Sequence, residues 1–368
     1  MKIGIDGRFL HRSESGHGTY SEELIKNLAQ IDNENEYVVF TNPSYESPLK
    51  QDNFSFVKTD IKHYSLKEQT SLHKILNSYN LDLMHFVHFN KPIFYKKKSI
   101  ATIHDLTLSY FRTNPFIKQK IYDYMIKKTI KSVDHIITDA EFTKDKITEV
   151  YNIDPDIISV IYLGYSDRFR PISNKTLIKS VTSGYNITKP YIVYLGQQRP
   201  HKNLARLVRA FSLFRKKGLD YQLVFIGKKN PNYLEMNKEI EATDLKNNII
   251  FTGFVPEDKI PVLISGSKLL VMPSLMEGFG LPVVEGFACH VPVASANTSS
   301  LPEVGGKAAA YFDPENVKEM AEVITSAVTD KYIRNKLIDN IDVQLKKFSW
   351  HKMAKEIQQV YKKVIQES

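Results

Sequence analysis

The chain has 368 residues, 42% of them hydrophobic and 25% charged, without the biased composition of a fibrous or disordered protein. At roughly 100–200 residues per domain, this length predicts two domains that each bury a core. The formal net charge of +9, from 50 Lys and Arg against 41 Asp and Glu, favours an anionic partner, but we find no nucleic-acid-binding motif and no run near the ~20 apolar residues of a membrane span.

The first half of the chain alternates short β-branched or aromatic runs with helical stretches, for instance helices at residues 19–30 and 116–132. This alternation is typical of a parallel sheet covered by helices. We therefore expect an α/β domain over residues 1–170. Its strands are expected at Lys2–Asp6, Tyr37–Phe40, Phe54–Val57, Leu83–Val87, Ser99–His104, Asp134–Thr138 and Ile157–Ile161.

Two segments of this half place polar chemistry next to predicted strands. Gly16-His17-Gly18-Thr19 opens a helix and leaves backbone amides for a phosphate; the alternative is a flexible loop. His104 ends a strand, where its imidazole can donate a hydrogen bond to a ligand hydroxyl or handle a proton; the alternative is a core histidine. Asp105 can cap the turn that follows.

The predicted helix around residues 116–133 is both apolar and basic. Its apolar residues Ile117, Ile121, Tyr124, Met125 and Ile130 are expected along one side, with Lys118, Lys120, Lys127, Lys128 and Lys131 mostly elsewhere. Two interpretations stay open. The helix can dock on an anionic lipid surface, or it can pack on the core while its lysines extend into water.

Asp154-Pro155-Asp156 has the Asp-x-Asp spacing that can hold a nucleotide through a divalent ion. The motif lies between a predicted helix and a predicted strand, so we interpret it as a turn. We expect no metal site in this protein.

A polar interval with Pro171, Gly184 and Pro190 predicts a linker over residues 171–189. A second α/β domain is then expected over residues 190–348, followed by a C-terminal helical segment over residues 349–368. The strands of this domain are expected at Tyr191–Leu195, Gln222–Ile226, Ile249–Phe251, Leu269–Met272 and Pro292–Ala294, and helices near residues 203–217, 232–243 and 277–288.

The segment after the first strand of this second domain combines a glycine with two cations. Gly196 follows the strand, and Arg199 and Lys202 lie just before the next helix. Two permanent positive charges at this position suit a diphosphate. A solvated cluster of surface charge is the alternative.

The most informative segment is Pro273–Glu285, which leaves a buried strand, turns through glycines and enters a helix. Backbone N–H groups at a helix start can face an anion. The residues expected to line that site are Gly278, Phe279, Gly280 and Leu281. Glu277 and Glu285 are eight positions apart, so on a helix they would share one side and reach different parts of a ligand.

This segment resembles that of the retaining glycosyltransferases of family four, in which the first of two glutamates separated by seven residues begins the sequence Glu-Gly-Phe-Gly-Leu-Pro. The resemblance covers nearly the whole chain and is strongest between Tyr191 and Asp313. It implies the GT-B fold, with two Rossmann-like domains facing a cleft, and a C-terminal helix that crosses back to the first domain.

The resemblance also implies roles for the site residues. Glu277 would contact the donor sugar and Glu285 the ribose hydroxyls, while Lys202 and Arg199 would neutralise the leaving diphosphate. Many members place the Arg directly after the glycine, where this chain has Gln197. The family's glycine-rich loop corresponds to Gly16 and Gly18 and approaches the donor phosphates and the acceptor, and the family's strand-end histidine corresponds to His104.

The implied activity is transfer of a hexose from a nucleotide diphosphate sugar to a hydroxyl of a glycan or lipid-linked acceptor, with retention of configuration and without metal or other cofactor. The Arg-Pro-His-Lys-Asn sequence is similar to that of bacterial mannosyltransferases of surface polysaccharide synthesis (O-antigen, capsule or exopolysaccharide), which makes GDP-mannose the first donor to test. A nucleotide-sugar epimerase of the same fold and a non-catalytic nucleotide-sugar-binding protein are the alternatives.

Cellular location is indicated by the cysteine count and the first residues. Cys289 is the only cysteine, which excludes an intrachain disulfide and fits a reducing compartment. The start of the chain lacks the apolar stretch of a signal peptide. We therefore expect a cytoplasmic protein, with a peripheral contact at the cytoplasmic face of the inner membrane through residues 116–133 as an open alternative.

Overall fold

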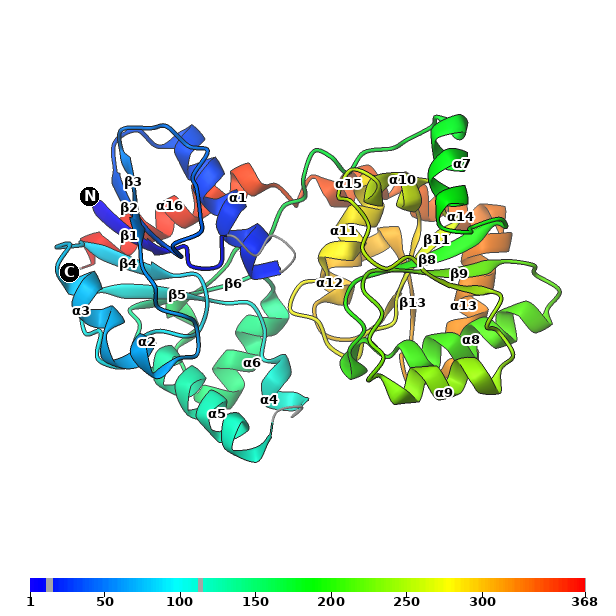
Figure 1. The fold of residues 1–368 in the computed structure, drawn as a ribbon, viewed down its shortest axis with the longest axis horizontal. Helices are drawn as coiled ribbons and strands as arrows, with labels where there is room; N and C mark the ends of the chain where they lie inside the picture. The colour runs from blue at the N-terminus through cyan, green and yellow to red at the C-terminus, as the bar shows by residue number, and fades with distance from the viewer. Residues whose placement is uncertain (11–15, 112–114, 368) are drawn as a thin grey trace. The chain divides into compact units, whose positions relative to one another are not determined.

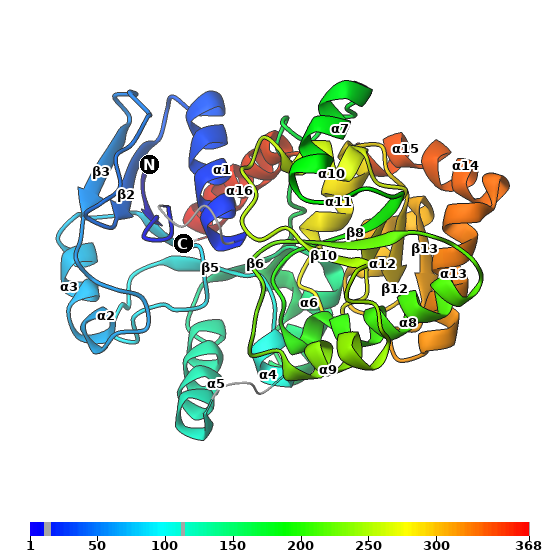
Figure 2. The same cartoon turned by 45° about the vertical axis from the view of Figure 1, so that its right-hand side comes forward.

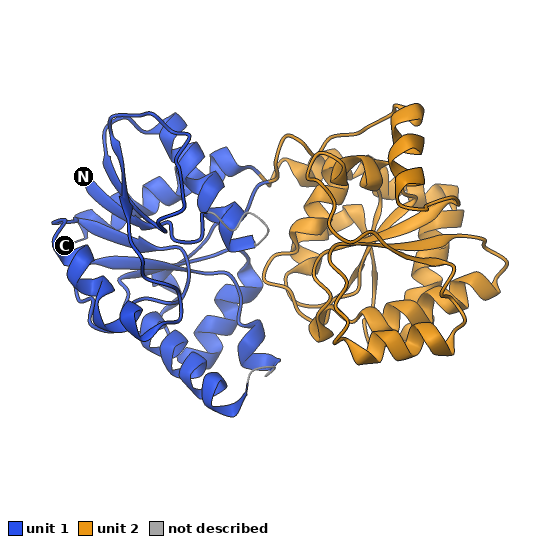
Figure 3. Ribbon diagram, viewed as in Figure 1, with its two compact units in different colours: residues 1–164, 349–368 blue, residues 165–348 orange. Residues whose placement is uncertain are grey.

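The computed structural model describes residues 1–10, 16–111 and 115–367, which form alternating strands and helices (Figure 1 and Figure 2). The chain divides into two compact units. Unit 1 comprises residues 1–164 and 349–368, and unit 2 comprises residues 165–348 (Figure 3).

Unit 1 contains a parallel sheet, which has seven strands among the described residues, in the order β3-β2-β1-β4-β5-β6-β7. The central strands are buried along their whole length, so they consist of nearly continuous apolar residues. The strands are β1 (Lys2–Asp6), β2 (Glu36–Thr41), β3 (Phe54–Lys58), β4 (Leu83–Phe86), β5 (Ser99–Ile103), β6 (His135–Thr138) and β7 (Ile158–Val160). All seven strands predicted for this half are confirmed within one or two residues.

Unit 2 contains a second parallel sheet, with six strands in its described residues, in the order β10-β9-β8-β11-β12-β13. The strands are β8 (Tyr191–Leu195), β9 (Gln222–Ile226), β10 (Ile249–Phe251), β11 (Leu269–Met272), β12 (Val293–Ala296) and β13 (Ala309–Phe312). Five of them were predicted. Strand β13 was not, because its sequence Ala-Ala-Tyr-Phe is half alanine, a residue depleted in strands.

Helices flank both sheets, which makes each unit doubly wound as predicted (Figure 1). The helices of unit 1 are α1 (Gly16–Ile31), α2 (Leu66–Thr70), α3 (Leu72–Asn77), α4 (Thr107–Tyr110), α5 (Phe116–Ile130), α6 (Glu141–Tyr151), η1 (Pro155–Ile157) and α16 (Trp350–Gln366). Those of unit 2 are α7 (Lys175–Gly184), η2 (Pro200–Lys202), α8 (Leu204–Lys216), α9 (Leu234–Ala242), α10 (Ile260–Ser265), α11 (Leu281–Ala288), α12 (Leu301–Gly305), η3 (Gly306–Ala308), α13 (Val317–Thr329), α14 (Lys331–Asp339) and α15 (Ile341–Leu345).

The division between the units falls after Gly164, six residues before the expected domain end at 170. The segment 171–189, predicted as a linker, belongs to unit 2 and contains α7. The side chain of Asn174 caps this helix by accepting from the Leu177 N–H at 3.0 Å, and α7 packs against α10. Pro, Ser and Asn at 171–174 therefore mark a helix start rather than a flexible connection.

The C-terminal helix α16 is part of unit 1, where it packs against α1. Its buried Tyr361 hydroxyl is 2.7 Å from His85 Nδ1 of β4, and Gln358 donates to Asp32 at 2.6 Å. Gly164 lies where the chain leaves unit 1, and a Cβ there would lie 2.1 Å from the backbone nitrogen of Trp350. Glycine at position 164 therefore lets α16 begin beside the end of the first segment.

Candidate active site

The predicted site residues of unit 2 lie at the point where the strand order of its sheet reverses. Strands β8 and β11 are neighbours there, and the chain continues to β9 and β10 on one side and to β12 and β13 on the other. The connections that leave the carboxyl ends of β8 and β11 must diverge, and such a switch point is where doubly wound sheets bind ligands. Gly196, Arg199 and Lys202 follow β8, and Glu277 follows β11.

The two connections are joined to each other by hydrogen bonds. The Leu275 N–H donates to the His201 carbonyl at 2.8 Å, and the Asn203 amide donates to the carbonyls of Pro273 and Pro314 at 3.0 and 2.7 Å. Asn203 is buried and has a left-handed φ of 60°, a conformation that asparagine tolerates better than most residues. The backbone of both loops is therefore fixed before any ligand binds.

The structure corrects the helix predicted over 277–288, because α11 begins only at Leu281. Gly280 precedes it with φ 97°, and a Cβ at this position would also lie 2.8 Å from Leu301 Cδ2. A left-handed residue cannot continue a right-handed helix, so the chain between Pro273 and Gly280 is a loop. Glu277 lies in this loop, and the prediction that it shares a helical face with Glu285 is wrong.

The best-defined contact of the site joins Lys202 to Glu277. The Lys202 ammonium donates to both carboxylate oxygens of Glu277, at 2.6 and 2.7 Å, and the Ser274 hydroxyl donates to Oε1 at 2.6 Å. Both charged side chains are mostly buried, with 17% and 10% of their surface exposed. Two residues 75 positions apart, each selected from its own motif, thus form one ion pair.

Two serines that the sequence analysis missed hold the Glu277 loop in place. The Glu277 N–H donates to the Ser299 hydroxyl at 3.0 Å. The buried Ser300 hydroxyl bonds the carbonyls of Glu277 and Phe279, at 3.1 and 3.0 Å. Both serines follow β12, the strand next to β11, so the only sequence signal for them was a run of small polar residues at a strand end.

The start of α11 has the features of an anion site. No side chain caps its first turn, and Gly280 occupies the N-cap position. Pro282 has no N–H, and the Val283 N–H already donates to the Gly280 carbonyl at 2.9 Å, so the Leu281 N–H is the group of the first turn that can attract negative charge. Gly278 and Leu281 are partly exposed beside it, whereas Phe279 is buried and packs edge-on against Phe348, so Phe279 can offer only its backbone to a ligand.

Glu285 lies on α11 in a different setting from that of Glu277. Burial raises the pKa of the Glu285 carboxyl to about 7, although the charge of Arg168 acts in the opposite direction. Among the residues that the structure describes, none donates a hydrogen bond to this carboxyl or forms an ion pair with it. Arg168 pairs instead with Glu257. The side chain is half-buried, and a desolvated carboxylate without donors is costly, so the Glu285 carboxyl is able to receive donors from a ligand.

Arg199 is exposed and is not brought into contact with the Lys202–Glu277 pair. In the described parts of the chain it has no ion pair, and it immediately precedes η2. Gly196 directly follows β8 and has φ 141°, a conformation in which a side chain would be strained. Of the two predicted cations, Lys202 is thus held by an ion pair with Glu277, whereas Arg199 extends into solvent.

The strand order of unit 1 reverses where β1 and β4 are neighbours; Gly16 and Gly18 lie on α1, which follows β1, and His104 lies beside β4. His104 follows β5, and its Nδ1 is 2.6 Å from Asp139 Oδ2, which follows β6. Its Nε2 is 3.0 Å from the carbonyl of Val87, which follows β4. Asp139 was missed in the sequence, although an Asp directly after a buried strand was a usable signal.

The Val87 carbonyl can only accept, and an ionised Asp139 carboxylate also accepts, so this geometry favours an imidazolium that donates from both ring nitrogens, although burial raises the pKa of Asp139. Burial of the ring opposes protonation, but the charge and hydrogen bond of Asp139, together with the Val87 carbonyl, outweigh it and raise the pKa of His104. In this arrangement His104 can donate to a hydroxyl after leaving Val87, but it has no nitrogen that can accept a proton. Asp105 caps the next turn, as expected, by accepting from the Thr107 N–H at 2.7 Å.

Aromatic rings and the start of α1 surround His104. Its ring centroid is 4.7 Å from that of Tyr20 and 4.9 Å from that of His17. Burial, followed by the charge of His104, lowers the pKa of His17 to about 3, so His17 is neutral. Gly16 is the first residue of α1, and a Cβ on it would contact nothing. Gly18 is buried in the same turn, and residues 11–15, which precede the helix, lie outside the described residues.

A buried ion network at the end of β1 was also missed. Arg8 donates to Asp6 at 2.7 and 2.6 Å and to Glu68 of α2 at 2.7 Å, and all three are at most 5% exposed. Although burial opposes it, the Arg8 guanidinium lowers the pKa of Asp6. The network therefore fixes the end of β1 and Arg8 to α2.

The described residues contain no group of three or more His, Cys, Asp or Glu placed to hold a metal ion. The Asp154 carboxylate accepts from the Asp156 N–H at 2.9 Å and starts η1, which agrees with its interpretation as a turn. No helix within residues 1–10, 16–111 and 115–367 is long and apolar enough to span a membrane.

Comparison with known proteins places both halves of the chain among sugar-transferring enzymes. The family model for glycosyl transferases group 1 matches residues 179–343, and that for glycosyltransferase family 4 matches residues 15–168. The chain is 27% identical to O-antigen chain mannosyltransferase B of Escherichia coli over 95% of this chain and 96% of that protein. It is 29% identical to the serotype-specific mannosyltransferase WbdA of Escherichia coli, over 70% of this chain but only 32% of WbdA.

Among solved structures, sucrose-phosphate synthase from Thermosynechococcus elongatus has a similar fold. The TM-score is 0.79 with 100% of both chains covered, at 16% sequence identity. At this identity the similarity concerns the fold alone.

Proposed function

The two halves of this chain belong to the group 1 and family 4 glycosyltransferases, with the GT-B fold, and we propose that the enzyme transfers a hexose with retention of configuration. Its donor is a nucleotide diphosphate sugar, with GDP-mannose as the first choice, and its acceptor is a hydroxyl of a glycan or lipid-linked glycan. The observation that supports this proposal most directly is the Lys202–Glu277 ion pair at the switch point of unit 2.

In this proposal each residue of unit 2 acts on one part of the donor. Lys202 and Arg199 stabilise the charge that develops on the leaving diphosphate, helped by the N–H groups at the start of α11. Once these cations have turned to the diphosphate, positive groups already in place lower the barrier without further reorganisation during the reaction. Glu285 accepts hydrogen bonds from the ribose hydroxyls, and Glu277 contacts the sugar. No metal is required, because the two cations and the helix start supply the positive charge.

Binding of the donor must then rearrange the existing ion pair. Lys202 donates both of its short bonds to Glu277, so a diphosphate competes with that carboxylate for the same ammonium. Once Lys202 turns to the phosphate, the Glu277 carboxylate is left to accept hydrogen bonds from sugar hydroxyls. One exchange of partners thus prepares both residues for their proposed roles.

In unit 1, His104 acts as a hydrogen-bond donor to a sugar or acceptor hydroxyl. Its Nε2–H is the group that can donate to a new acceptor, because the distance from Nε2 to the Val87 carbonyl oxygen is 3.0 Å, whereas Nδ1 lies only 2.6 Å from Asp139 Oδ2. The backbone around Gly16 and Gly18 contributes amides to phosphate or acceptor.

The proposed biological setting is the synthesis of a bacterial surface polysaccharide, with the O-antigen as the first expectation. It is supported by the near-complete coverage of O-antigen chain mannosyltransferase B by this chain. The enzyme would work in the cytoplasm, where nucleotide sugars are made.

The first test is thermal melting of the purified protein with GDP-, UDP-, ADP- and dTDP-sugars, with and without EDTA, since a ligand of the folded state raises the melting temperature. We expect a shift with one nucleotide family that EDTA does not change. A second test separates the alternatives with the donor so identified. Transfer to a hydroxyl acceptor supports the proposal, a converted nucleotide sugar without acceptor indicates an epimerase, and binding without turnover under any acceptor indicates a sensor.

A further inference from the structure

Helix α5 has two apolar faces, and only one of them is used by the fold. Tyr122, Met125, Ile126 and Ile130 are buried against the core of unit 1. The apolar residues predicted along one side of this helix therefore lie on two sides, one buried and one exposed. On the outward side, the exposed fraction is 72% for Phe116, 72% for Ile117, 58% for Ile121 and 57% for Tyr124. Figure 2 shows α5 projecting from the rest of unit 1.

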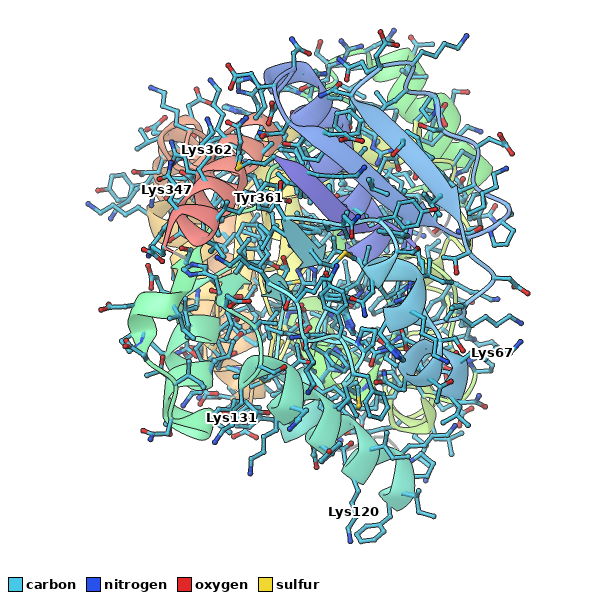
Figure 4. All side chains as sticks on the ribbon, turned by 90° about the vertical axis from the view of Figure 1, so that its left-hand side faces the viewer. Lys67, Lys120, Lys131, Lys347, Tyr361 and Lys362 are labelled. Atoms are coloured by element: carbon cyan, nitrogen blue, oxygen red, sulfur yellow. The ribbon has the colours of Figure 1, made fainter. Side chains whose placement is uncertain are left out.

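The same outward side is strongly basic. Lys118, Lys120, Lys127, Lys128 and Lys131 are all exposed, and Asp123 is the one acidic residue between 116 and 131, so five positive charges and one negative give a net charge of +4. In the described part of the chain none of these lysines forms an ion pair; Lys120 lies over the Phe116 ring, 4.4 Å from its centroid. Figure 4 shows Lys120 at the tip of α5, pointing away from the unit.

The apolar and basic residues share one surface in a definite order. At 100° per residue, the exposed apolar side chains and four of the lysines fall within about 140° of the helix circumference. The apolar residues occupy positions 116–124, and Lys127, Lys128 and Lys131 occupy the last turns. We call the residues Phe116, Ile117, Lys120, Ile121, Tyr124, Lys127, Lys128 and Lys131 the α5 ridge.

We propose that the α5 ridge docks on the surface of a bilayer that contains anionic phospholipids. A helix that combines large apolar side chains with lysines on its exposed side lies in the interface, where the apolar groups enter the acyl boundary and the lysines pair with headgroup phosphates. The ridge offers both contacts without unfolding or losing its packing on unit 1, because the core uses the opposite face of the helix.

The charge distinguishes a membrane from the other occupants of such a surface. In a two-fold dimer the ridge would meet its own copy, and unpaired lysines of the two chains would repel each other. A nucleic acid would pair with the lysines but leave Ile117 and Ile121 in water. Only a surface that is both anionic and apolar a few ångströms below satisfies every exposed group of the ridge.

Co-sedimentation of the full chain with vesicles tests the proposal directly. We expect binding to vesicles of equal parts phosphatidylglycerol and phosphatidylcholine, and none to phosphatidylcholine alone. Raising the ionic strength from about 0.1 M to about 1 M shortens the screening length from about 10 Å to about 3 Å and should release most of the protein. The assay contains neither donor nor acceptor, so its result is independent of the proposed transferase activity.

Two variants test the two contacts separately. Lys127→Gln, Lys128→Gln and Lys131→Gln together should weaken binding by about 100-fold, since each lysine near an anionic surface contributes roughly fivefold. Ile117→Ser with Ile121→Ser should also weaken binding, but without reducing its salt dependence. The matched controls are unit 2 residues of the same type and exposure, namely Lys331→Gln with Lys336→Gln and Lys347→Gln, and Leu234→Ser with Val343→Ser.

The α5 substitutions are at exposed positions, so an unchanged melting temperature should show that the variants remain folded. The proposal is overturned if the wild-type chain stays in the supernatant with anionic vesicles, or if the control variants weaken binding as much as the α5 variants. It is also overturned if light scattering shows a dimer that Ile117→Ser with Ile121→Ser dissociates, because the ridge is then an interface between copies of the chain.

Discussion

Glu285→Gln should make the unliganded protein more stable at neutral pH while weakening its binding of nucleotide. In the wild type, burial raises the pKa of this carboxyl from 4.5 to about 7. The folded state therefore holds a proton that the unfolded chain releases between these two pH values. Since the folded state binds more protons in this window, the free energy of unfolding falls as the pH rises from about 4.5 to about 7.

The size of the effect follows from the two pKa values. Their difference of about 2.5 corresponds to about 3 kcal/mol, at about 1.36 kcal/mol for each pKa unit. Glutamine at position 285 keeps the shape of the side chain but never ionises. The variant should thus match the wild type near pH 4.5 and exceed it by up to about 3 kcal/mol above pH 7, or about 6–12 °C in melting temperature for a domain of this size.

Thermal melting of both proteins between about pH 4.5 and about pH 8 measures this difference. Glu322→Gln is a matched control, because Glu322 is an exposed glutamate of unit 2 on α13. Its melting curve should follow that of the wild type at every pH. Nucleotide affinity is measured on the same proteins, and we expect Glu285→Gln to bind about 10–100-fold more weakly, since hydrogen bonds to a charged acceptor contribute about 1.5–3 kcal/mol.

Parallel melting curves for the wild type and Glu285→Gln would refute the reasoning, since they would mean that the folded state does not perturb this carboxyl. A variant that is stabilised at neutral pH yet binds nucleotide as tightly as the wild type would refute the ribose contact alone. The two measurements therefore separate the electrostatic argument from the functional one.

Two further predictions concern the ion pairs of the site. Lys202→Met should abolish transfer and lower the free energy of unfolding by about 3 kcal/mol, because it leaves the Glu277 carboxylate buried without its cation. Adding Glu277→Gln should restore the melting temperature but not the turnover. An undiminished melting temperature in Lys202→Met alone would contradict the stabilising role of the ion pair. Asp139→Asn should destabilise the protein most below pH 6.5, because the protonated His104 ring has no carboxylate partner in the variant. The difference in melting temperature from the wild type should narrow as the pH rises through the raised pKa of His104. A difference that is constant from about pH 5 to about pH 9 would contradict the role of Asp139.

The strands were predictable because parallel strands covered on both faces are short, continuous apolar runs, and such runs stand out in a sequence. The Glu277 loop was harder. Glycines at 278 and 280 were correctly interpreted as a turn, but the helix start depends on the left-handed φ of Gly280, which sequence periodicity does not show. The segment 171–189 was predicted as a linker from its proline and asparagine, but Asn174 caps helix α7. The same residue types occur in linkers and at helix starts, so the sequence alone could not distinguish the two.

The site's contacts were the part that no local pattern could give. Lys202 and Glu277 were chosen from separate motifs, but their pairing depends on β8 and β11 being neighbours, which follows only from the strand order. Asp139 directly follows a buried strand, but its role depends on His104, which follows the adjacent strand β5. Residues that act through a neighbour on another strand acquire their role from the topology.

The two glutamates of the motif differ in a way that predicts how ligand binding divides between them. Glu277 already has a cation and a hydroxyl donor, so a ligand gains little from it until Lys202 has turned to a phosphate. Glu285 receives no hydrogen bond within the described chain, and burial raises its pKa to about 7. Any nucleotide with free ribose hydroxyls can therefore donate hydrogen bonds to it at once. A free nucleoside should therefore draw on Glu285 alone, whereas a nucleoside diphosphate should also draw on Lys202. Substitution of Glu285 should weaken the binding of both ligands by the same factor, whereas Lys202→Met should weaken only the binding of the diphosphate. Equal losses for both ligands in Lys202→Met would mean that the pair serves the shape of the loop rather than the charge of the leaving group.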